Sequence, residues 1–189
     1  MGCGKSSVGR KLSQLLCCPF MDLDAEIEAR YGCAVADIFA RDGEAEFRRI
    51  EKETLKDILE TGGRVLEISP SSSTPARKNQ EHPSNERPQM ILALGGGAVM
   101  TPECEQMVHG QTKCIYLRTS VEELVARLTD ESAGRPLLAS SDLKTRIETL
   151  MSLRMETYER TAHHIISTDS KTIDEVGKEI ITRMATCKP

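Results

Sequence analysis

Short, continuously apolar runs alternate along this chain with longer segments in which apolar residues recur every three or four positions. Such runs, bounded by turn residues, are typical of strands covered on both faces. They occupy residues 19–21, 90–94, 114–117 and 164–167, with a weaker edge-strand candidate at 65–68. Helical periodicity occupies residues 5–16, 25–30, 34–61, 120–128, 143–158 and 172–184. This alternation predicts an α/β fold with a mainly parallel sheet.

Local signals predict where several helices begin and end. Gly43 divides residues 34–61 into two helices, in the way that a left-handed cap does. Residues 120–123 and 172–175 have the pattern of a capping box, which places a helix start at each.

Length and composition narrow the class of protein. The chain has 189 residues, enough for one domain, and its core must be aliphatic because Trp is absent. The net charge of −4 argues against nucleic acid or an anionic membrane as a partner, since both need a basic face. No apolar run approaches the roughly 18 residues of a membrane span. Seven cysteines, without zinc-site spacing, fit the reduced thiols of a cytoplasmic protein.

Residues 69–90 differ from the rest of the chain in composition. They hold four prolines, many small polar residues and no large apolar side chain before Met90. Such a segment buries too little surface to offset its ordering entropy, so we expect a flexible, solvated loop over about 69–89. A partner-binding or phosphorylated segment is the alternative.

The turn before the first helix carries the tail of a phosphate-binding loop. Gly4-Lys5-Ser6 matches the end of the pattern G-x-x-x-x-G-K-[S/T]. Glycines let backbone N–H groups reach phosphate oxygens, Lys5 reaches the β- and γ-phosphates, and the Ser6 hydroxyl ligates Mg²⁺. The tripeptide also arises by chance, but the apolar-faced helix that follows favours a nucleotide site.

Two carboxylates, Asp22 and Asp24, follow the strand at residues 19–21. Carboxylates at the end of a strand suit a Mg²⁺ contact and a base that orients a hydroxyl. A solvated turn in which Asp24 caps the next helix is an equally good interpretation.

Three arginines are candidate anion ligands. Arg154 lies on an otherwise apolar helical stripe, where an arginine must be paired or face a cleft; a structural pair with a glutamate is the alternative. Arg48 neighbours Arg49 in a charged helix, so a solvated position explains it as well. Arg135, in the polar loop 129–141, fits either a lid arginine or an ordinary loop residue.

Gly95-Gly96-Gly97 follows the buried strand at 90–94. Three glycines exceed what a tight turn needs and favour close backbone approach to a ligand. Because ligands of parallel sheets bind at the carboxyl ends of the strands, these glycines, the aspartates and the Gly-Lys-Ser turn should share one rim.

Taken together, these motifs resemble shikimate kinase, a small P-loop kinase of the nucleoside-monophosphate kinase fold. The matching stretches, in the family's order, are GCGKSSVGRKL, PFMDLDAEIE, GEAEFRRIE, LALGGGAV, GRPLL and LMSLRMETY. They cover nearly the whole chain except residues 65–90, which resemble an insertion.

The resemblance implies transfer of the ATP γ-phosphoryl group to the 3-hydroxyl of shikimate, in aromatic amino-acid biosynthesis, by a cytoplasmic monomer. The implied phosphate contacts are Gly2, Cys3, Gly4, Lys5, Ser6, Ser7 and Arg135. Mg²⁺ would be held by Ser6 and Asp22, and Asp24 would bind the shikimate hydroxyls and act as the base. The implied contacts to the rest of the acceptor, chiefly its carboxylate, are Arg48, Gly95, Gly96, Gly97 and Arg154. Helices over about 25–61 would bind substrate, and residues 129–141 would form a lid.

Two other functions compete with this one. A gluconate-type or other small-metabolite P-loop kinase shares the phosphate loop, whereas Gly95–Gly97 and the Arg-Pro-Leu-Leu stretch at 135–138 favour shikimate. A truncated, non-catalytic chain is the second alternative, because the loop pattern starts before residue 1.

In the family, the strand before the phosphate loop is the middle strand of a sheet ordered 2-3-1-4-5. Without it a sheet loses roughly five ladder hydrogen bonds, each worth about 1 kcal/mol, against a typical domain stability of roughly 5–15 kcal/mol. We therefore expect the chain as written to fold poorly alone, and we expect a gap or distorted seam between strands 90–94 and 114–117. A start codon assigned too late is the simplest explanation.

Overall fold

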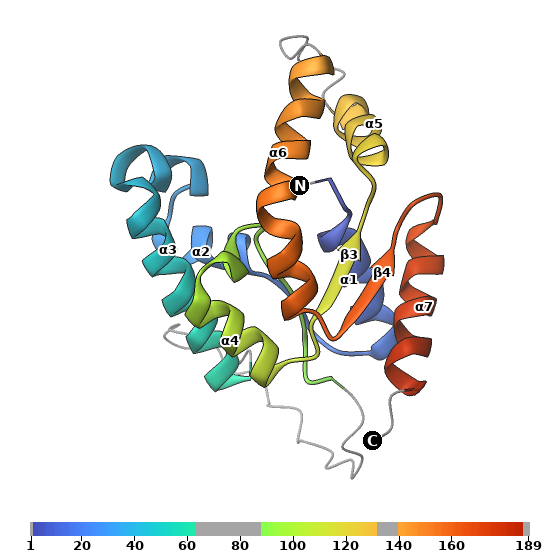
Figure 1. Cartoon of the computed structure of the whole chain (residues 1–189). Coiled ribbons are helices and arrows are strands. Elements are labelled where there is room, and N and C mark those ends of the chain that lie inside the picture. Colours follow the sequence, from blue (N-terminus) through green and yellow to red (C-terminus); the bar gives the residue numbers. More distant parts are fainter. Residues whose placement is uncertain (1, 63–87, 132–139, 187–189) are drawn as a thin grey trace.

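Strands and helices alternate through the structure, a computed structural model that describes residues 2–62, 88–131 and 140–186. In chain order the elements are α1 (Lys5–Leu16), β1 (Phe20–Asp22), α2 (Leu23–Tyr31), α3 (Val35–Thr61), β2 (Ile91–Ala93), the 3₁₀ turn η1 (Ala98–Met100), α4 (Pro102–Gln111), β3 (Ile115–Arg118), α5 (Val121–Glu131), α6 (Ser140–Thr161), β4 (His164–Ser167) and α7 (Ile173–Thr186). The α/β fold class is confirmed, and each strand predicted within the described residues is present (Figure 1).

Polar side chains determine where α5 and α7 begin. Thr172 and Glu175 form the complete capping box before α7: the Thr172 N–H donates to Glu175 Oε2 at 2.8 Å, and the Glu175 N–H donates to Thr172 Oγ1 at 3.3 Å. Helix α5 has half of the predicted box, because the Glu123 N–H donates to Ser120 Oγ while the Ser120 N–H donates to Asp169 Oδ1 at 2.9 Å. The start of α5 is thereby tied to the loop after β4.

Gly43 interrupts α3, as the sequence predicts, but in a different conformation from the expected left-handed cap. Its backbone has φ 81° and ψ 173°, which is extended at positive φ. A side chain is strained at such a φ, so glycine is the residue that permits this break. The break separates the first part of α3, which buries Ile38, from the second part, which buries Phe47, Ile50 and Leu55 in the same core.

Helix α4 and η1 were not predicted from the sequence. Pro102 stands in the first turn of α4, where its missing N–H costs nothing. Cys104 and Val108, four residues apart, are both buried on its inner face. The apolar signal is only those residues and Met107, which is too sparse to separate a short helix from a loop.

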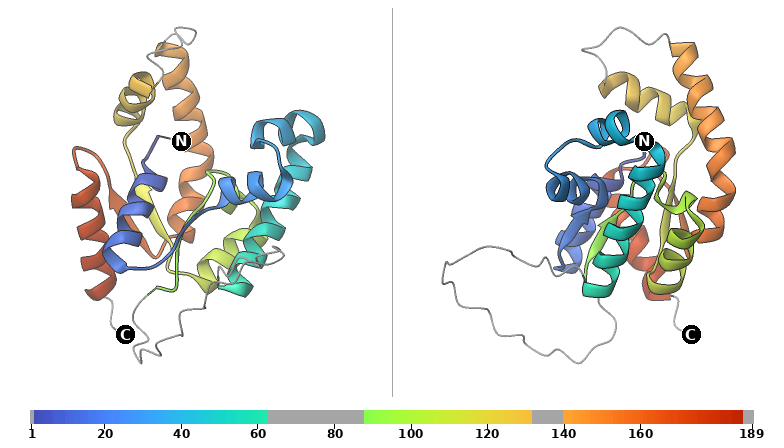
Figure 2. Two further views of the ribbon diagram at one scale, coloured as in Figure 1. Left: turned by 180° about the vertical axis from the view of Figure 1, so that it is seen from behind. Right: turned by 90° about the vertical axis from the view of Figure 1, so that its left-hand side faces the viewer.

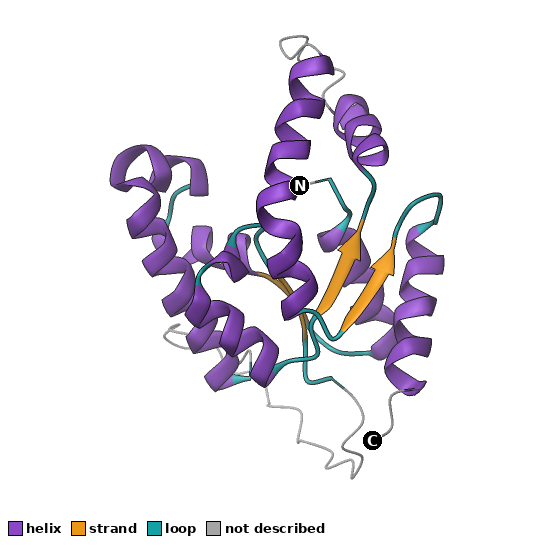
Figure 3. Cartoon of the chain, in the orientation of Figure 1, coloured by secondary structure: helices purple, strands orange, loops and turns teal. Residues whose placement is uncertain are grey.

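The strands form two separate parallel pairs. Strand β1 pairs with β2 in the register Phe20–Ile91, and β3 pairs with β4 in the register Ile115–His164. Among the described residues, β2 and β3 share no ladder, so the predicted seam between them is confirmed. Figure 3 shows β3 and β4 side by side, with β2 set apart behind α6.

Helix α1 joins the two strand pairs. It packs against β2 on one side and against α7 on the other, and the rear view in Figure 2 shows α1 beside α7. Its apolar face contributes Val8 and Leu12 to a core cluster that Ile91 of β2 and Ile115 of β3 also contact. Side-chain packing under α1 therefore bridges strands that no backbone ladder connects.

A second, larger core lies under α2, α3 and α4. Its fully buried members include Leu23, Ile27, Ile38, Ile50 and Leu55. This cluster fixes α2 and α3 beside β1 and β2, and thus beside the carboxyl ends of those strands.

Several expectations concern residues outside the described ranges. They include the loop at 69–89, except residues 88 and 89, and Arg135 with most of the lid at 129–141. The division of the chain into substrate-binding helices, inserted loop and lid stays a prediction. No helix in the described parts is long and apolar enough to cross a membrane.

Gly9 explains how closely α1 approaches β1, and it allows a test. A Cβ built on Gly9 would lie 2.5 Å from Cε2 of Phe20, so Gly9→Ala must displace the ring. We expect Gly9→Ala to lower the free energy of unfolding by about 1–3 kcal/mol, measured by urea denaturation. Gly110→Ala in α4 is the control, because a Cβ there meets no atom within 4 Å and alanine favours the helix by about 0.5–1 kcal/mol. Equal stability of the Gly9→Ala variant and the wild type would contradict this packing.

Candidate active site

The N-terminus of α1 has the form of an anion site. Gly4 caps the helix in the left-handed conformation at φ 78°, and the first turn contains no acidic residue. The first N–H groups of a helix have no partner within it and lie at the positive end of its dipole. Lys5 Nζ lies 3.9 Å from Cys3 Sγ, so its ammonium stays beside the loop. Backbone donors and a lysine ammonium thus converge where a phosphate would lie.

Ser6 and Asp22 are sixteen positions apart in sequence but in direct contact. The Ser6 hydroxyl donates to Asp22 Oδ2 at 2.6 Å. Asp22 Oδ1 also accepts from the Asp24 N–H at 3.2 Å, so Asp22 caps α2. The alternative in which Asp24 is the cap is therefore wrong, because α2 begins at Leu23, two residues before the expected helix start at Ala25, which places Asp24 inside the first turn. A hydroxyl and a carboxylate held side by side fit the oxygen ligands that Mg²⁺ takes.

Asp24 lies in the first turn of α2 and faces the glycine loop. A Cβ on Gly95 would lie 2.7 Å from Asp24 Oδ1, which leaves no room for a side chain there. Burial raises the pKa of Asp24, and the charge of Asp22 adds to that effect, while Lys5 and Arg48 act against it. Asp24 is thus a carboxylate of increased basicity within electrostatic reach of both cations.

Glu51 ends the matching stretch GEAEFRRIE, but the sequence assigned it no role in the site. Its side chain is 1% exposed, and Oε2 accepts from Arg48 Nη1 at 2.6 Å. A Cβ on Gly95 would lie 3.1 Å from Glu51 Oε1, so Glu51 and Asp24 flank the same glycine. Burial is the main reason that the pKa of Glu51 is raised. The helical stripe of Phe47, Ile50 and Leu55 already placed Glu51 on the buried face.

The structure separates Arg48 from its neighbour Arg49. The Arg48 side chain is 23% exposed and lies against the glycine loop, since a Cβ on Gly97 would be 2.7 Å from its Cζ. The Arg49 side chain is 51% exposed and pairs with Glu46 and Glu53 on the outer surface. The solvated interpretation therefore describes Arg49, and Arg48 lines the site.

Arg154 reaches the same loop from α6. Its Nη1 donates to the Gly96 carbonyl at 3.3 Å, and the Tyr158 hydroxyl donates to the same oxygen. Arg154 forms no ion pair with a described carboxylate, so the expected alternative of a structural glutamate pair does not hold within those ranges. A half-buried guanidinium bonded only to a carbonyl keeps most of its donors for a ligand.

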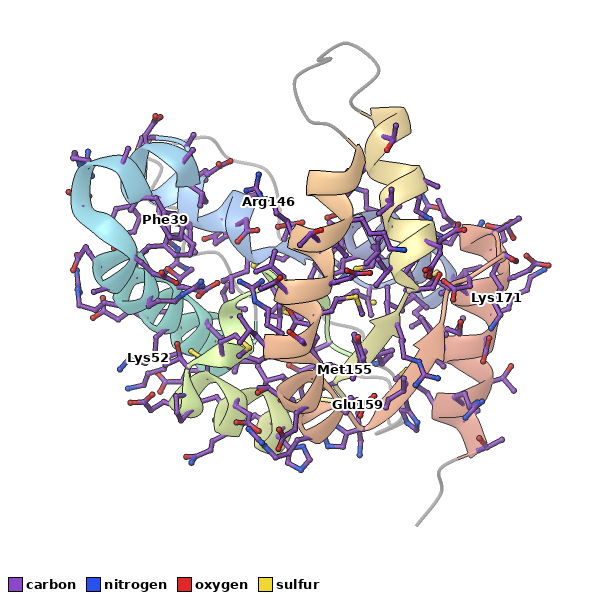
Figure 4. The ribbon with its side chains drawn as sticks, turned by 45° about the horizontal axis from the view of Figure 1, so that its top comes forward. Phe39, Lys52, Arg146, Met155, Glu159 and Lys171 are labelled. Atoms are coloured by element: carbon purple, nitrogen blue, oxygen red, sulfur yellow. The ribbon has the colours of Figure 1, made fainter. Side chains whose placement is uncertain are left out.

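These groups line a cavity of about 750 Å³ that also extends among apolar side chains of the two strand pairs and α1, including Val8, Ile91 and Ile115. Its lining includes Lys5, Asp24, Arg48, Arg154 and the Gly95–Gly97 loop, so the three motifs do share one rim. Figure 4, which looks toward this end of the molecule, labels Phe39 on the side formed by α3 and Arg146 on the side formed by α6. The cavity lining takes Phe39 and Arg48 from α3 and Arg154 from α6.

Comparisons with known proteins agree with this geometry. The profile of the family described as shikimate kinase matches residues 1–85 and 78–185. The shikimate kinase of Thermus thermophilus is 33% identical over 184 residues, which cover 97% of this chain and 85% of that protein. The enzyme of Bordetella pertussis is 36% identical over 184 residues, covering 97% and 74%. The solved structure of shikimate kinase from Acinetobacter baumannii in complex with shikimate matches with a TM-score of 0.76 at 28% identity, covering 100% of this chain and 90% of that one.

The fold and the site define a P-loop kinase of the α/β class. More particularly, this chain belongs to the shikimate kinase family, as the family profile and relatives matched over nearly its whole length show.

The environment of Asp24 predicts a gain in stability when its charge is removed. Because the folded-state pKa is raised, the folded protein holds the proton more tightly, and stability falls as pH rises from the unfolded value of about 3.8 through the folded one. We expect Asp24→Asn to raise the Tm at pH 7, by about 2–4 °C for each kcal/mol gained. The difference from wild type should disappear below that pH window.

Asp42→Asn is the control for this measurement. Its exposed carboxylate bonds Arg41, which lowers its pKa, so loss of that charge should not raise the Tm. A Tm of Asp24→Asn at or below the wild-type value at pH 7 would show that Asp24 is not an unfavourable buried charge.

Proposed function

We propose that this chain transfers the γ-phosphoryl group of ATP to the 3-hydroxyl of shikimate, giving shikimate 3-phosphate and ADP. The observation that carries the proposal is the placement of two guanidinium groups, Arg48 and Arg154, on the glycine loop of the cavity whose other wall carries Lys5. Paired guanidinium forks suit a carboxylate, and shikimate carries a carboxylate together with ring hydroxyls.

The donor end holds the nucleotide. Backbone N–H groups of Gly2, Cys3, Gly4, Lys5, Ser6 and Ser7 bind the phosphates of ATP, as the free donors at the start of α1 support. Lys5 reaches the β- and γ-phosphates, and Arg135 closes over them with the lid. Ser6 and Asp22, already in contact, would hold Mg²⁺, which would neutralise charge on the phosphates.

The acceptor end holds shikimate. Arg48 and Arg154 bind its carboxylate, and Gly95, Gly96 and Gly97 line its pocket. Neither the Gly96 nor the Gly97 N–H donates to any described group, so both are available to an anion. Asp24, beside Gly95, accepts hydrogen bonds from the ring hydroxyls.

Asp24 receives the proton when the 3-hydroxyl oxygen attacks the γ-phosphorus. The new P–O bond forms as the bond from that phosphorus to the bridging oxygen of ADP breaks, and the electron pair leaves with ADP. Lys5 stabilises the negative charge on the phosphoryl oxygens during the transfer. The raised pKa of Asp24 makes it a better proton acceptor than a solvated aspartate. Lid closure excludes water, which would otherwise take the phosphoryl group.

We also propose that the chain acts in the cytoplasm, as a monomer, in the route to aromatic amino acids. The six described cysteines are all free, which suits a reducing compartment. Light scattering after size exclusion, with and without reductant, tests the monomer.

Acceptor choice distinguishes this function from a gluconate-type kinase. With ATP and Mg²⁺, we expect much faster ADP formation with shikimate than with gluconate, because gluconate is a flexible open chain that must lose conformational freedom to place one hydroxyl at Asp24 while both arginines hold its carboxylate. A coupled ADP assay measures the rate, and ³¹P NMR identifies the product. If the protein phosphorylates gluconate but not shikimate, the proposed acceptor is wrong.

Arg48→Lys tests the contact between Arg48 and the substrate carboxylate, and Arg49→Lys, at the neighbouring residue on the outer surface, is the control. We expect the KM for shikimate to rise about 10–100-fold, as the loss of a charged hydrogen bond worth about 1.5–3 kcal/mol predicts. The KM for ATP should not change. Arg49→Lys, which alters only a surface ion pair, should leave both within about twofold. If the two substitutions change the KM for shikimate equally, Arg48 does not bind the acceptor.

A further inference from the structure

The Gly96 carbonyl is the point where α6 meets the glycine loop. It accepts one hydrogen bond from Tyr158 Oη and a longer one, 3.3 Å, from Arg154 Nη1. A Cβ on Gly96 would lie 3.5 Å from Arg154 Nη1 and 3.7 Å from Tyr158 Oη, so both side chains lie directly on this peptide. Arg154 and Tyr158 are four residues apart and share one face of the helix.

Tyr158 is itself held in place. Its ring packs against Tyr116 of β3, with centroids 5.3 Å apart, and contacts the core under α3 and α4. The main donor to the Gly96 carbonyl is therefore a rigid phenol, whereas Arg154 is a long side chain at the distance limit of a hydrogen bond.

The consequence concerns the carboxylate of the acceptor. A carbonyl in a half-buried loop costs free energy when it loses its partner. Because Tyr158 satisfies the Gly96 carbonyl, Arg154 can turn its guanidinium to an anion without leaving that oxygen unpaired. The same hydrogen bond fixes the plane of the Gly96–Gly97 peptide, and with it the direction of the Gly97 N–H.

We propose that Tyr158 is a positioning residue that sets the specificity of the site for a carboxylate. It holds the glycine loop so that Arg154 and the loop N–H groups converge on one anion. This inference rests on the proposed function, and it goes beyond it by assigning a role to a residue that the proposed function does not use.

Tyr158→Phe, with Tyr116→Phe as the matched control, tests the proposal. The two rings are in contact, and the Tyr116 hydroxyl makes no hydrogen bond with a described residue. The control therefore removes a phenol oxygen but keeps the hydrogen bond from Tyr158 to the Gly96 carbonyl. Binding of two ligands is measured by calorimetry: shikimate, and the analogue with a hydroxymethyl group in place of the carboxylate. Turnover and Tm are recorded in parallel.

We expect Tyr158→Phe to weaken shikimate binding about 3- to 10-fold, as the loss of one hydrogen bond predicts. The affinity for the hydroxymethyl analogue and the KM for ATP should not change. Tyr116→Phe should match wild type for both ligands. An equal loss for shikimate and the analogue means that Tyr158 only supports the fold, and unchanged shikimate binding means that it positions nothing; either result overturns the proposal.

A second variant keeps the test decisive when Tyr158→Phe does not fold. 4-Aminophenylalanine at position 158 keeps the ring and a weaker N–H donor, so we expect a smaller loss that is again confined to shikimate. A loss shared with the analogue rejects the proposal. Failure of the proposed function is recognised separately, because it leaves the wild type without shikimate turnover, while the ratio of the two binding constants still decides the role of Tyr158.

Discussion

Helix α1 is the element on which both halves of the molecule depend. The two strand pairs share no ladder within the described residues, so they are held together by side chains that pack under this helix and α7. Hydrophobic packing has no direction, but Val8 and Leu12 fix which face of α1 is buried. That choice also fixes where its N-terminus points. The packing that joins the halves therefore places the first residue of α1, Lys5, at the cavity that the Gly95–Gly97 loop also lines.

Around the cavity, charges of opposite sign are held close without cancelling completely. Glu51 is almost fully buried and forms an ion pair with Arg48. The Arg48 guanidinium in turn packs against Gly97, where it leaves no room for a Cβ. Arg154 has no described carboxylate as a partner, and Asp24 has a raised pKa because burial and Asp22 outweigh Lys5 and Arg48. The cavity is thus lined by two guanidinium groups, of which Arg154 has no described carboxylate partner, and by Asp24, a carboxylate of increased basicity.

Sequence reasoning placed the strands, the main helices and the shared rim because each depends on local pattern. It missed α4, whose few apolar residues are not distinctive, and it left Arg48 undecided, because adjacent arginines look alike until the helix is packed. Asp22 is the cap of α2 because the helix begins at Leu23, whereas the sequence pattern placed its start at Ala25. Glu51 was visible on the apolar stripe of α3, and only its contact with Arg48 and Gly95 gave it a meaning. Tyr158 looked like one more core position.

The sequence by itself determined the class of fold, the nucleotide end and the identity of most polar groups in the cavity. It could do so because periodicity, glycine content and the Gly-Lys-Ser turn are properties of neighbouring residues. The tertiary structure alone decided which of these groups meet: Ser6 with Asp22, Arg48 with Gly97, and Tyr158 with Gly96. Those contacts join residues from 16 to 62 positions apart. Their geometry depends on how helices pack on strands, which no local pattern encodes.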